Sequence, residues 1–110
     1  MTEAIREVRG HLVVALGGDI DLDRAPAVRR QLLDCVNRQR DVLVDLSAVT
    51  YIDSSGIASL VEALQRATSR GTSLSLVAVS PQAHRVFELA RLDKVFAIHP
   101  DIDAALAAAD

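Results

Sequence analysis

The stretch VLVDLSAVTYIDSSGIASLVEAL, residues 42–64, decides how this chain is expected to fold. It opens with VLVDL at 42–46, a short run rich in β-branched residues that is typical of a buried strand. Its last third, residues 57–64, places apolar side chains three and four positions apart, which indicates one buried face of a helix. The Asp-Ser-Ser-Gly segment at 53–56 therefore lies where a strand passes into a helix.

The segments on either side continue this alternation of strands and helices. Arg9–Gly10 predicts a hairpin turn, Gly17–Gly18 a break after the second strand, and Gly71 the end of a helix. We expect strands at 4–8, 12–16, 42–46, 74–79 and 95–98, and helices with apolar faces at 25–36, 57–64, 83–90 and 102–109. The order predicts an α/β fold with a mixed, mostly parallel sheet of about five strands, about four helices and an antiparallel N-terminal hairpin.

Composition and charge exclude several classes of protein. The 110 residues suit one domain, 1–110, and a net charge of −3 argues against direct nucleic-acid binding. Cys35 is the single cysteine, which excludes an internal disulfide and indicates a reducing compartment. No stretch approaches the roughly 18 apolar residues that would cross a membrane. We therefore expect a soluble cytoplasmic protein with no membrane insertion, no metal and no cofactor.

The Asp-Ser-Ser-Gly segment carries more polar groups than a helix start requires. Either Asp53 or Ser54 can cap the helix, since both residue types accept hydrogen bonds from unpaired amides there. Gly56 in the first helical turn costs about 1 kcal/mol relative to alanine, so we expect it to leave bare backbone at a surface, with room for a partner to approach closely. Because loops after parallel strands form the binding edge of such sheets, this segment is a candidate functional site.

Three segments of the chain resemble one known family. Residues 42–64 are similar to the signature of the STAS domain, in which Asp-Ser-Ser/Thr-Gly opens a helix. LGGDIDLDRAPAVRRQL at 16–32 is similar to the family's Gly-Glu-Leu-Asp segment, and SLVAVSPQAHRVFELARLDKVFAIHPDIDAAL at 75–106 resembles its C-terminal part. The likeness covers nearly the whole chain, and it implies a STAS-type domain of the anti-sigma factor antagonist class.

That resemblance implies a regulatory switch. Antagonists of this family bind an anti-sigma factor that is a GHKL-type serine kinase, which phosphorylates them on the serine after the motif aspartate. Here that serine is Ser54. A phosphatase for phospho-Ser54 reverses the modification, and the chain is expected as a monomer or weak dimer. The implied partner-binding residues are Asp21, Asp53, Ser54, Ser55, Gly56 and Ile57.

A phosphate on Ser54 is compatible with the expected fold. The dipole and unpaired N–H groups at a helix N-terminus favour an anion, so we expect the domain to stay folded when modified. A partner surface shaped for a neutral serine would instead meet added bulk and negative charge.

Two other functions fit parts of the sequence. The family often has Gly-Leu-Gly where this chain has Gly56-Ile57-Ala58, which leaves open a STAS accessory subunit that binds the ATPase of a phospholipid-trafficking ABC transporter. A Ser-His-Asp hydrolase could draw on His11, His84 or His99. Its nucleophile turn needs Gly-x-Ser-x-Gly, and no glycine stands two residues before either serine, so we expect no enzymatic activity.

Overall fold

The strand that opens residues 42–64 lies in the centre of a five-stranded sheet. The structure, a computed structural model, describes residues 4–109. The sheet order is β1-β2-β3-β4-β5, with β1 antiparallel to β2 and the other neighbours parallel. The strands are β1 Ala4–Val8, β2 His11–Ile20, β3 Val42–Ile52, β4 Leu74–Val77 and β5 Ile98–His99. The helices are α1 Ala25–Val36, α2 Ser54–Ser69, α3 Pro81–Leu89, the 3-10 helix η1 Leu92–Lys94 and α4 Ile102–Ala109. This arrangement confirms the predicted fold class and the predicted order of elements.

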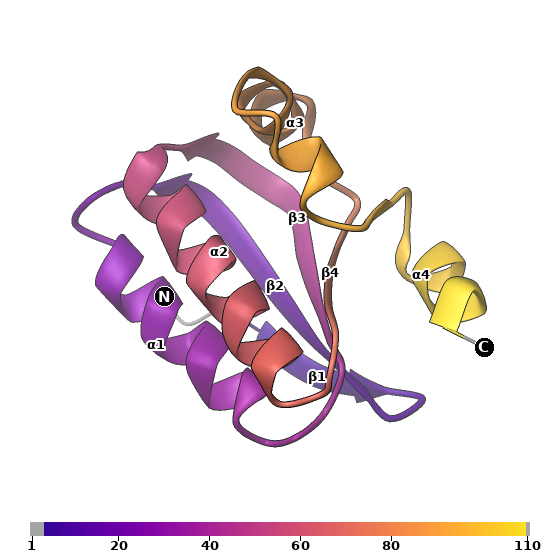
Figure 1. Cartoon of the computed structure of the whole chain (residues 1–110). Coiled ribbons are helices and arrows are strands. Elements are labelled where there is room, and N and C mark those ends of the chain that lie inside the picture. The colour runs from indigo at the N-terminus through magenta and orange to yellow at the C-terminus, as the bar shows by residue number, and fades with distance from the viewer. Residues whose placement is uncertain (1–3, 110) are drawn as a thin grey trace.

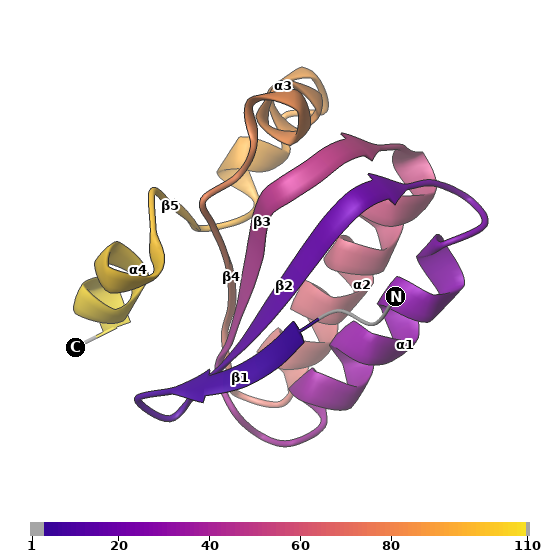
Figure 2. The ribbon, with the colours of Figure 1, turned by 180° about the vertical axis from the view of Figure 1, so that it is seen from behind.

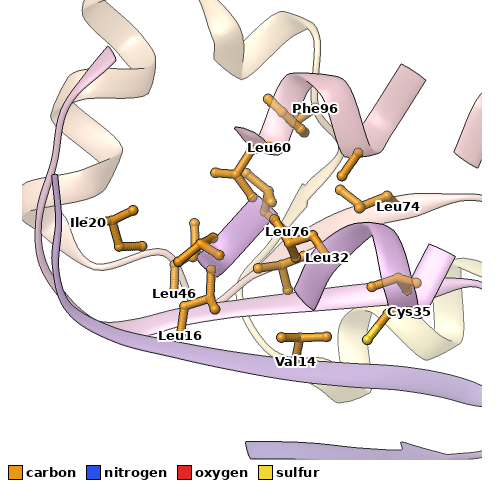
Figure 3. Close-up of a cluster of buried hydrophobic side chains, with 14 of the residues drawn as sticks. Val14, Leu16, Ile20, Leu32, Cys35, Leu46, Leu60, Leu74, Leu76 and Phe96 are labelled. Carbon is orange, nitrogen blue, oxygen red and sulfur yellow. The ribbon is translucent and has the colours of Figure 1, made fainter. Parts of the chain in front are cut away.

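Helices α1 and α2 lie side by side over one face of the sheet (Figure 1), and the view from behind shows the strands uncovered by them (Figure 2). Alternate strand residues such as Val14, Leu16 and Val44 point into the main core beneath these two helices. Figure 3 shows this core, with Cys35 of α1 pointing in beside Val14. Val13, Leu43 and Val77 face the other way and form a smaller cluster with Ala105 and Leu106 of α4.

The predicted break at Gly17–Gly18 is wrong, because β2 continues through both glycines to Ile20. The pairing with β3 shifts register between Ala15 and Gly17 and again between Gly18 and Asp19. A Cβ on Gly17 would lie 3.2 Å from Cβ of Ala48, and Gly18 has a φ of +72°. The two glycines therefore allow bulges within the strand and do not end it.

Strand β3 is also longer than predicted. It runs past Leu46 to Ile52, and its second half pairs with the end of β2, with Asp19 opposite Tyr51 and Ile20 opposite Ile52. Val49 and Ile52 are buried in this half, whereas the residues between them are exposed. Because of this extension, the Asp-Ser-Ser-Gly segment lies next to the end of β2.

The C-terminal strands differ from their predicted bounds. Strand β4 ends at Val77 and not at residue 79, because Ala78 takes a φ of +53°, which leaves the extended conformation. The strand expected at 95–98 is wrong in position, since β5 covers only Ile98–His99. Val95 instead follows the last residue of η1 and is 52% exposed, while Phe96 turns inward and packs edge-to-face on Phe87 with ring centroids 5.9 Å apart. The apolar run at 95–98 thus forms a turn and a ring contact as well as a strand.

Candidate functional site

The carboxyl ends of β2 and β3 lie next to each other, and both lead directly into helices. The backbone N–H of Asp53 donates to the carbonyl of Ile20 at 3.2 Å, which joins the two strand ends. The chain leaves β2 through Asp21 toward α1, and it leaves β3 through Asp53 into α2 (Figures 1 and 2). The structure therefore brings together the two loops that carry the predicted site residues.

Asp53 is the helix cap, which decides between the two residues that the sequence allowed. Its Oδ1 accepts the backbone N–H of Ser55 at 2.9 Å and that of Gly56 at 3.2 Å. The same oxygen accepts the hydroxyl of Ser55 at 2.5 Å. The Ser55 hydroxyl lowers the pKa of the Asp53 carboxyl most; partial burial opposes it, and the amides of Gly56, Ser55 and Leu22 lower it further. Asp53 therefore stays ionised well into the acidic range.

The two serines occupy different environments. Ser54 is the first residue of α2 and is exposed, and within residues 4–109 no group hydrogen-bonds its hydroxyl. Ser55 is half-buried, and its hydroxyl already donates to Asp53. A modifying enzyme can approach Ser54 from solvent, whereas modification of Ser55 would first break the bond to the capping carboxylate.

The expected reason for Gly56 is wrong. Gly56 is buried, and a Cβ there would lie 2.7 Å from Cγ1 of Ile52 and 2.8 Å from Cγ2 of Ile20. It would also lie 3.1 Å from the carbonyl oxygen of Ile20. The close approach is therefore made by the chain's own strand ends, and Gly56 lets α2 start directly against the sheet.

The expected free amides for a phosphate are also partly wrong. The N–H groups of Ser55 and Gly56 both already donate to the Asp53 carboxylate. A phosphate on Ser54 would stand at the positive end of the α2 dipole, but beside a carboxylate that holds two of its amides. Its negative charge would add to that of Asp53.

The Asp21 loop forms the second half of the site. The carboxylate and the carbonyl of Asp21 each accept the N–H of Arg24 at 3.1 Å, and the carbonyl also accepts Ala25 N–H at 2.9 Å. Next along β2, the carboxylate of Asp19 accepts the hydroxyl of Thr50 at 2.6 Å. Asp21 is thus tied into the start of α1 at half exposure, and it stands at the same edge as Asp53.

Leu22 at this edge was not predicted from the sequence, and Ala58 was singled out only as a departure from the family pattern. Leu22 is 73% exposed and Ala58 is exposed, whereas the predicted Ile57 is half-buried and packs against the main core. Leu22 and Ala58 line one end of a groove of about 580 Å³ between α1 and α2. Further along it, Arg29 and Glu62 join the two helices through bonds of 2.6 and 2.7 Å. An apolar residue between two aspartates was the signal for Leu22.

His11 and His84 contact groups other than Ser54. His11 Nδ1 is 3.3 Å from the carbonyl of Arg9, and its Nε2 is 3.8 Å from Asp41. His84 faces Glu88 on α3 at 3.3 Å.

In the part of the chain that the structure describes, no group of three or more His, Cys, Asp or Glu could hold a metal ion. Over the same residues, no helix combines the length and apolar character needed to cross a membrane.

Comparison with known proteins gives the family of this fold. The model of the STAS domain family matches residues 3–105. The chain is 32% identical over 89 residues to the anti-sigma-B factor antagonist of Listeria monocytogenes, covering 80% of this chain and 78% of that one. This chain belongs to the STAS domain family, and these relatives are regulatory proteins.

Solved structures agree with the fold. An anti-sigma factor antagonist from Mycobacterium paratuberculosis is 31% identical, with a TM-score of 0.88 over 97% of this chain and 92% of that one. The phosphorylated form of SpoIIAA, a Bacillus cell fate determinant, superposes with a TM-score of 0.74 over 99% of this chain and all of that one. At 15% identity, the second likeness shows the shared fold alone.

Proposed function

We propose that this chain is an anti-sigma factor antagonist that binds a kinase-type anti-sigma factor and thereby frees its sigma factor. Phosphorylation of Ser54 by that GHKL-type kinase switches binding off, and a phosphatase restores it. The partner meets the edge formed by Asp21, Asp53, Ser54, Ser55 and the first turn of α2. The chain supplies no catalytic chemistry of its own in this scheme. The antagonists among its relatives support the first step.

The observation that carries the proposal is the difference between Ser54 and Ser55. Ser54 presents an exposed hydroxyl at the first position of a 16-residue helix, with Asp53 fixed beside it as the cap. Ser55 already uses its hydroxyl to bond that cap. Of the two adjacent serines, Ser54 is the one that a kinase reaches without disturbing the helix start.

Phosphorylation of Ser54 would act on the surface and leave the core in place. The phosphate brings about −1.5 to −2 charges beside the ionised Asp53. A partner surface that fits a neutral hydroxyl then meets both bulk and like charge. Losing about 3 kcal/mol at such an interface weakens binding more than a hundredfold, which is enough for an on–off response.

The test is a pull-down from native lysate with wild type, Ser54→Ala and Ser54→Asp, each checked for folding by circular dichroism. Ser73→Asp is the matched control, because it adds the same charge at an exposed position just before β4, at the opposite edge of the sheet. We expect wild type, Ser54→Ala and Ser73→Asp to recover a GHKL-type kinase, and Ser54→Asp to lose it.

The recovered kinase then serves for a phosphorylation assay with ATP. We expect mass spectrometry to place the phosphate on Ser54 in the wild type, and Ser54→Ala to remain unmodified while Ser55→Ala is still modified. Equal capture of the kinase by Ser54→Asp would contradict the switch. Recovery of an ABC transporter ATPase with all variants would instead support the accessory-subunit function.

A further inference from the structure

Arg24 stands at the start of α1 in a position where helices usually have a capping side chain. It makes no such cap bond. Its guanidinium instead reaches back to the end of β2, where Nη1 donates to the carbonyl of Gly17 at 2.6 Å and to that of Asp19 at 2.8 Å. The backbone N–H of the same residue donates to the carboxylate of Asp21 at 3.1 Å. Arg24 therefore bonds the strand end and the following loop at once.

The end of β2 needs such a partner because its ladder with β3 is irregular. Register shifts flank Gly17 and Gly18, and a bulge leaves backbone groups without their regular partners. A charged donor forms stronger hydrogen bonds to these carbonyls than a neutral one does. The bonds to Gly17 and Asp19 lie on either side of Gly18, whose φ of +72° turns the strand. Arg24 thus supplies hydrogen bonds to backbone carbonyls in the irregular part of β2.

The loop beyond this strand end runs from Asp21 to the start of α1 and lies beside the start of α2. Leu22 lies one residue after Asp21, and its backbone amide lies close enough to the carboxylate of Asp53 to lower the pKa of that group. Its side chain is 73% exposed and lines the groove beside Ser55 and Ala58. The Leu22 position therefore depends on a loop in which Arg24 bonds both Asp21 and the strand end that precedes it.

We propose that Arg24 is a positioning residue that holds the Asp21–Leu22 loop against Asp53, so that Leu22 stands in a fixed place beside the first turn of α2. Arg24 acts through this loop and need not touch a partner itself. That the edge is a binding surface rests on the proposed function. The positioning is a property of the free protein and is tested there.

The experiment uses the full chain with Arg24→Met, which keeps a long apolar stem but has no donor, and Arg24→Lys, which keeps a charged nitrogen donor. Arg30→Ala is the control, because it removes an exposed positive charge from the same helix. NMR measures amide hydrogen exchange at Leu22 and throughout the core, and carbon-detected titration follows the Asp53 carboxyl.

We expect Arg24→Met to speed exchange at Leu22 by about tenfold relative to the core amides, the effect of losing a local bond network of ordinary strength. The pKa of Asp53 should rise slightly in this variant, because the Leu22 amide no longer holds its place while the Ser55 hydroxyl and the Gly56 amide still lower that pKa. Arg24→Lys should restore both readouts in large part, and Arg30→Ala should move neither.

Three results would overturn the positioning role: an unchanged Leu22 exchange rate in Arg24→Met, an equal acceleration at every core amide, or the same Asp53 shift in Arg30→Ala. An unchanged Leu22 rate would mean that Arg24 does not hold the loop. Equal acceleration at every core amide would mean that the variant destabilises the whole domain. The same shift in Arg30→Ala would mean that the Asp53 pKa responds only to the loss of a positive charge. Failure here leaves the Ser54 pull-down untouched, and failure of that pull-down leaves these measurements on the free protein valid.

Discussion

Gly56→Ala tests whether the start of α2 is held by close packing against the sheet. At an ordinary helix position this change stabilises a protein by about 1 kcal/mol, because alanine is the better helix former. Here the new methyl would lie 2.7 Å from Cγ1 of Ile52, 2.8 Å from Cγ2 of Ile20 and 3.1 Å from the carbonyl oxygen of Ile20. Two of these distances are shorter than carbon atoms tolerate.

The neighbours of Gly56 have little freedom to move. Ile20 and Ile52 are buried and face each other across the paired strand ends, and the carbonyl of Ile20 accepts the N–H of Asp53. Inserting a methyl into a packed core costs about 1–3 kcal/mol. Since the rigid carbonyl favours the upper part of that range, the penalty exceeds the helix gain and leaves a net loss of about 1–2 kcal/mol. For a chain of this size, that lowers Tm by roughly 4–8 °C.

Urea unfolding followed by circular dichroism measures the change, and position 65 supplies the control. Gln65 is exposed on the same helix, so Gln65→Ala should be more stable than Gln65→Gly, with the opposite sign from alanine against glycine at position 56. Combining Gly56→Ala with Ile52→Ala should cost less than the sum of the two changes, because the smaller side chain makes room. If Gly56→Ala stabilises the protein, as alanine does relative to glycine at position 65, the packing argument is refuted.

Three further outcomes are expected. Asp53→Asn should have a lower free energy of unfolding than wild type at neutral pH, because a carboxyl with a lowered pKa contributes stability above its ordinary titration range. This difference between the variant and wild type should vanish as pH falls through the lowered pKa of Asp53. A difference that stays constant with pH in urea titrations would contradict this. Ser80→Ala removes a buried hydroxyl that caps α3 and donates to the carbonyl of Val49 at 2.7 Å, so unfolding free energy should fall by about 1–3 kcal/mol, measured by urea midpoint. The Cys35 thiol is fully buried, and burial raises its pKa, so a disulfide reagent should label it slowly in native protein and rapidly in urea; fast native labelling would place it at the surface.

The helices were predictable because each carries an apolar stripe and a local start signal. Ser80–Pro81 begins α3 and Asp53 begins α2, and both signals act over three or four residues of chain. The long strands were only half predictable. The second half of β3 alternates polar and apolar residues that also suit a loop, and its extended form depends on pairing with the bulged end of β2. Likewise, the apolar run at 95–98 predicts a strand at Phe96, although contact with Phe87 draws that ring into the core.

The candidate site divides in the same way. Its location at the end of β3, and the presence of a cap among Asp53 and Ser54, followed from the sequence, because capping is local chemistry. The different environments of Ser54 and Ser55 could not be predicted from the sequence, since they depend on which side chain turns toward Asp53. Arg24 could not be found from the sequence, because its partners are carbonyls at Gly17 and Asp19 that become available only where β2 bulges.

The amino-acid sequence by itself determined the order of strands and helices, the edge at which polar residues gather, and the family to which the chain belongs. These depend on periodicity, local caps and motif order, all of which are present along the chain. The tertiary structure decided why Gly56 is a glycine, which serine is open to solvent, and which strand carbonyls Arg24 bonds. Each of those follows from contacts between β2, β3 and the helices that start after them, and such contacts exist only once the sheet has formed.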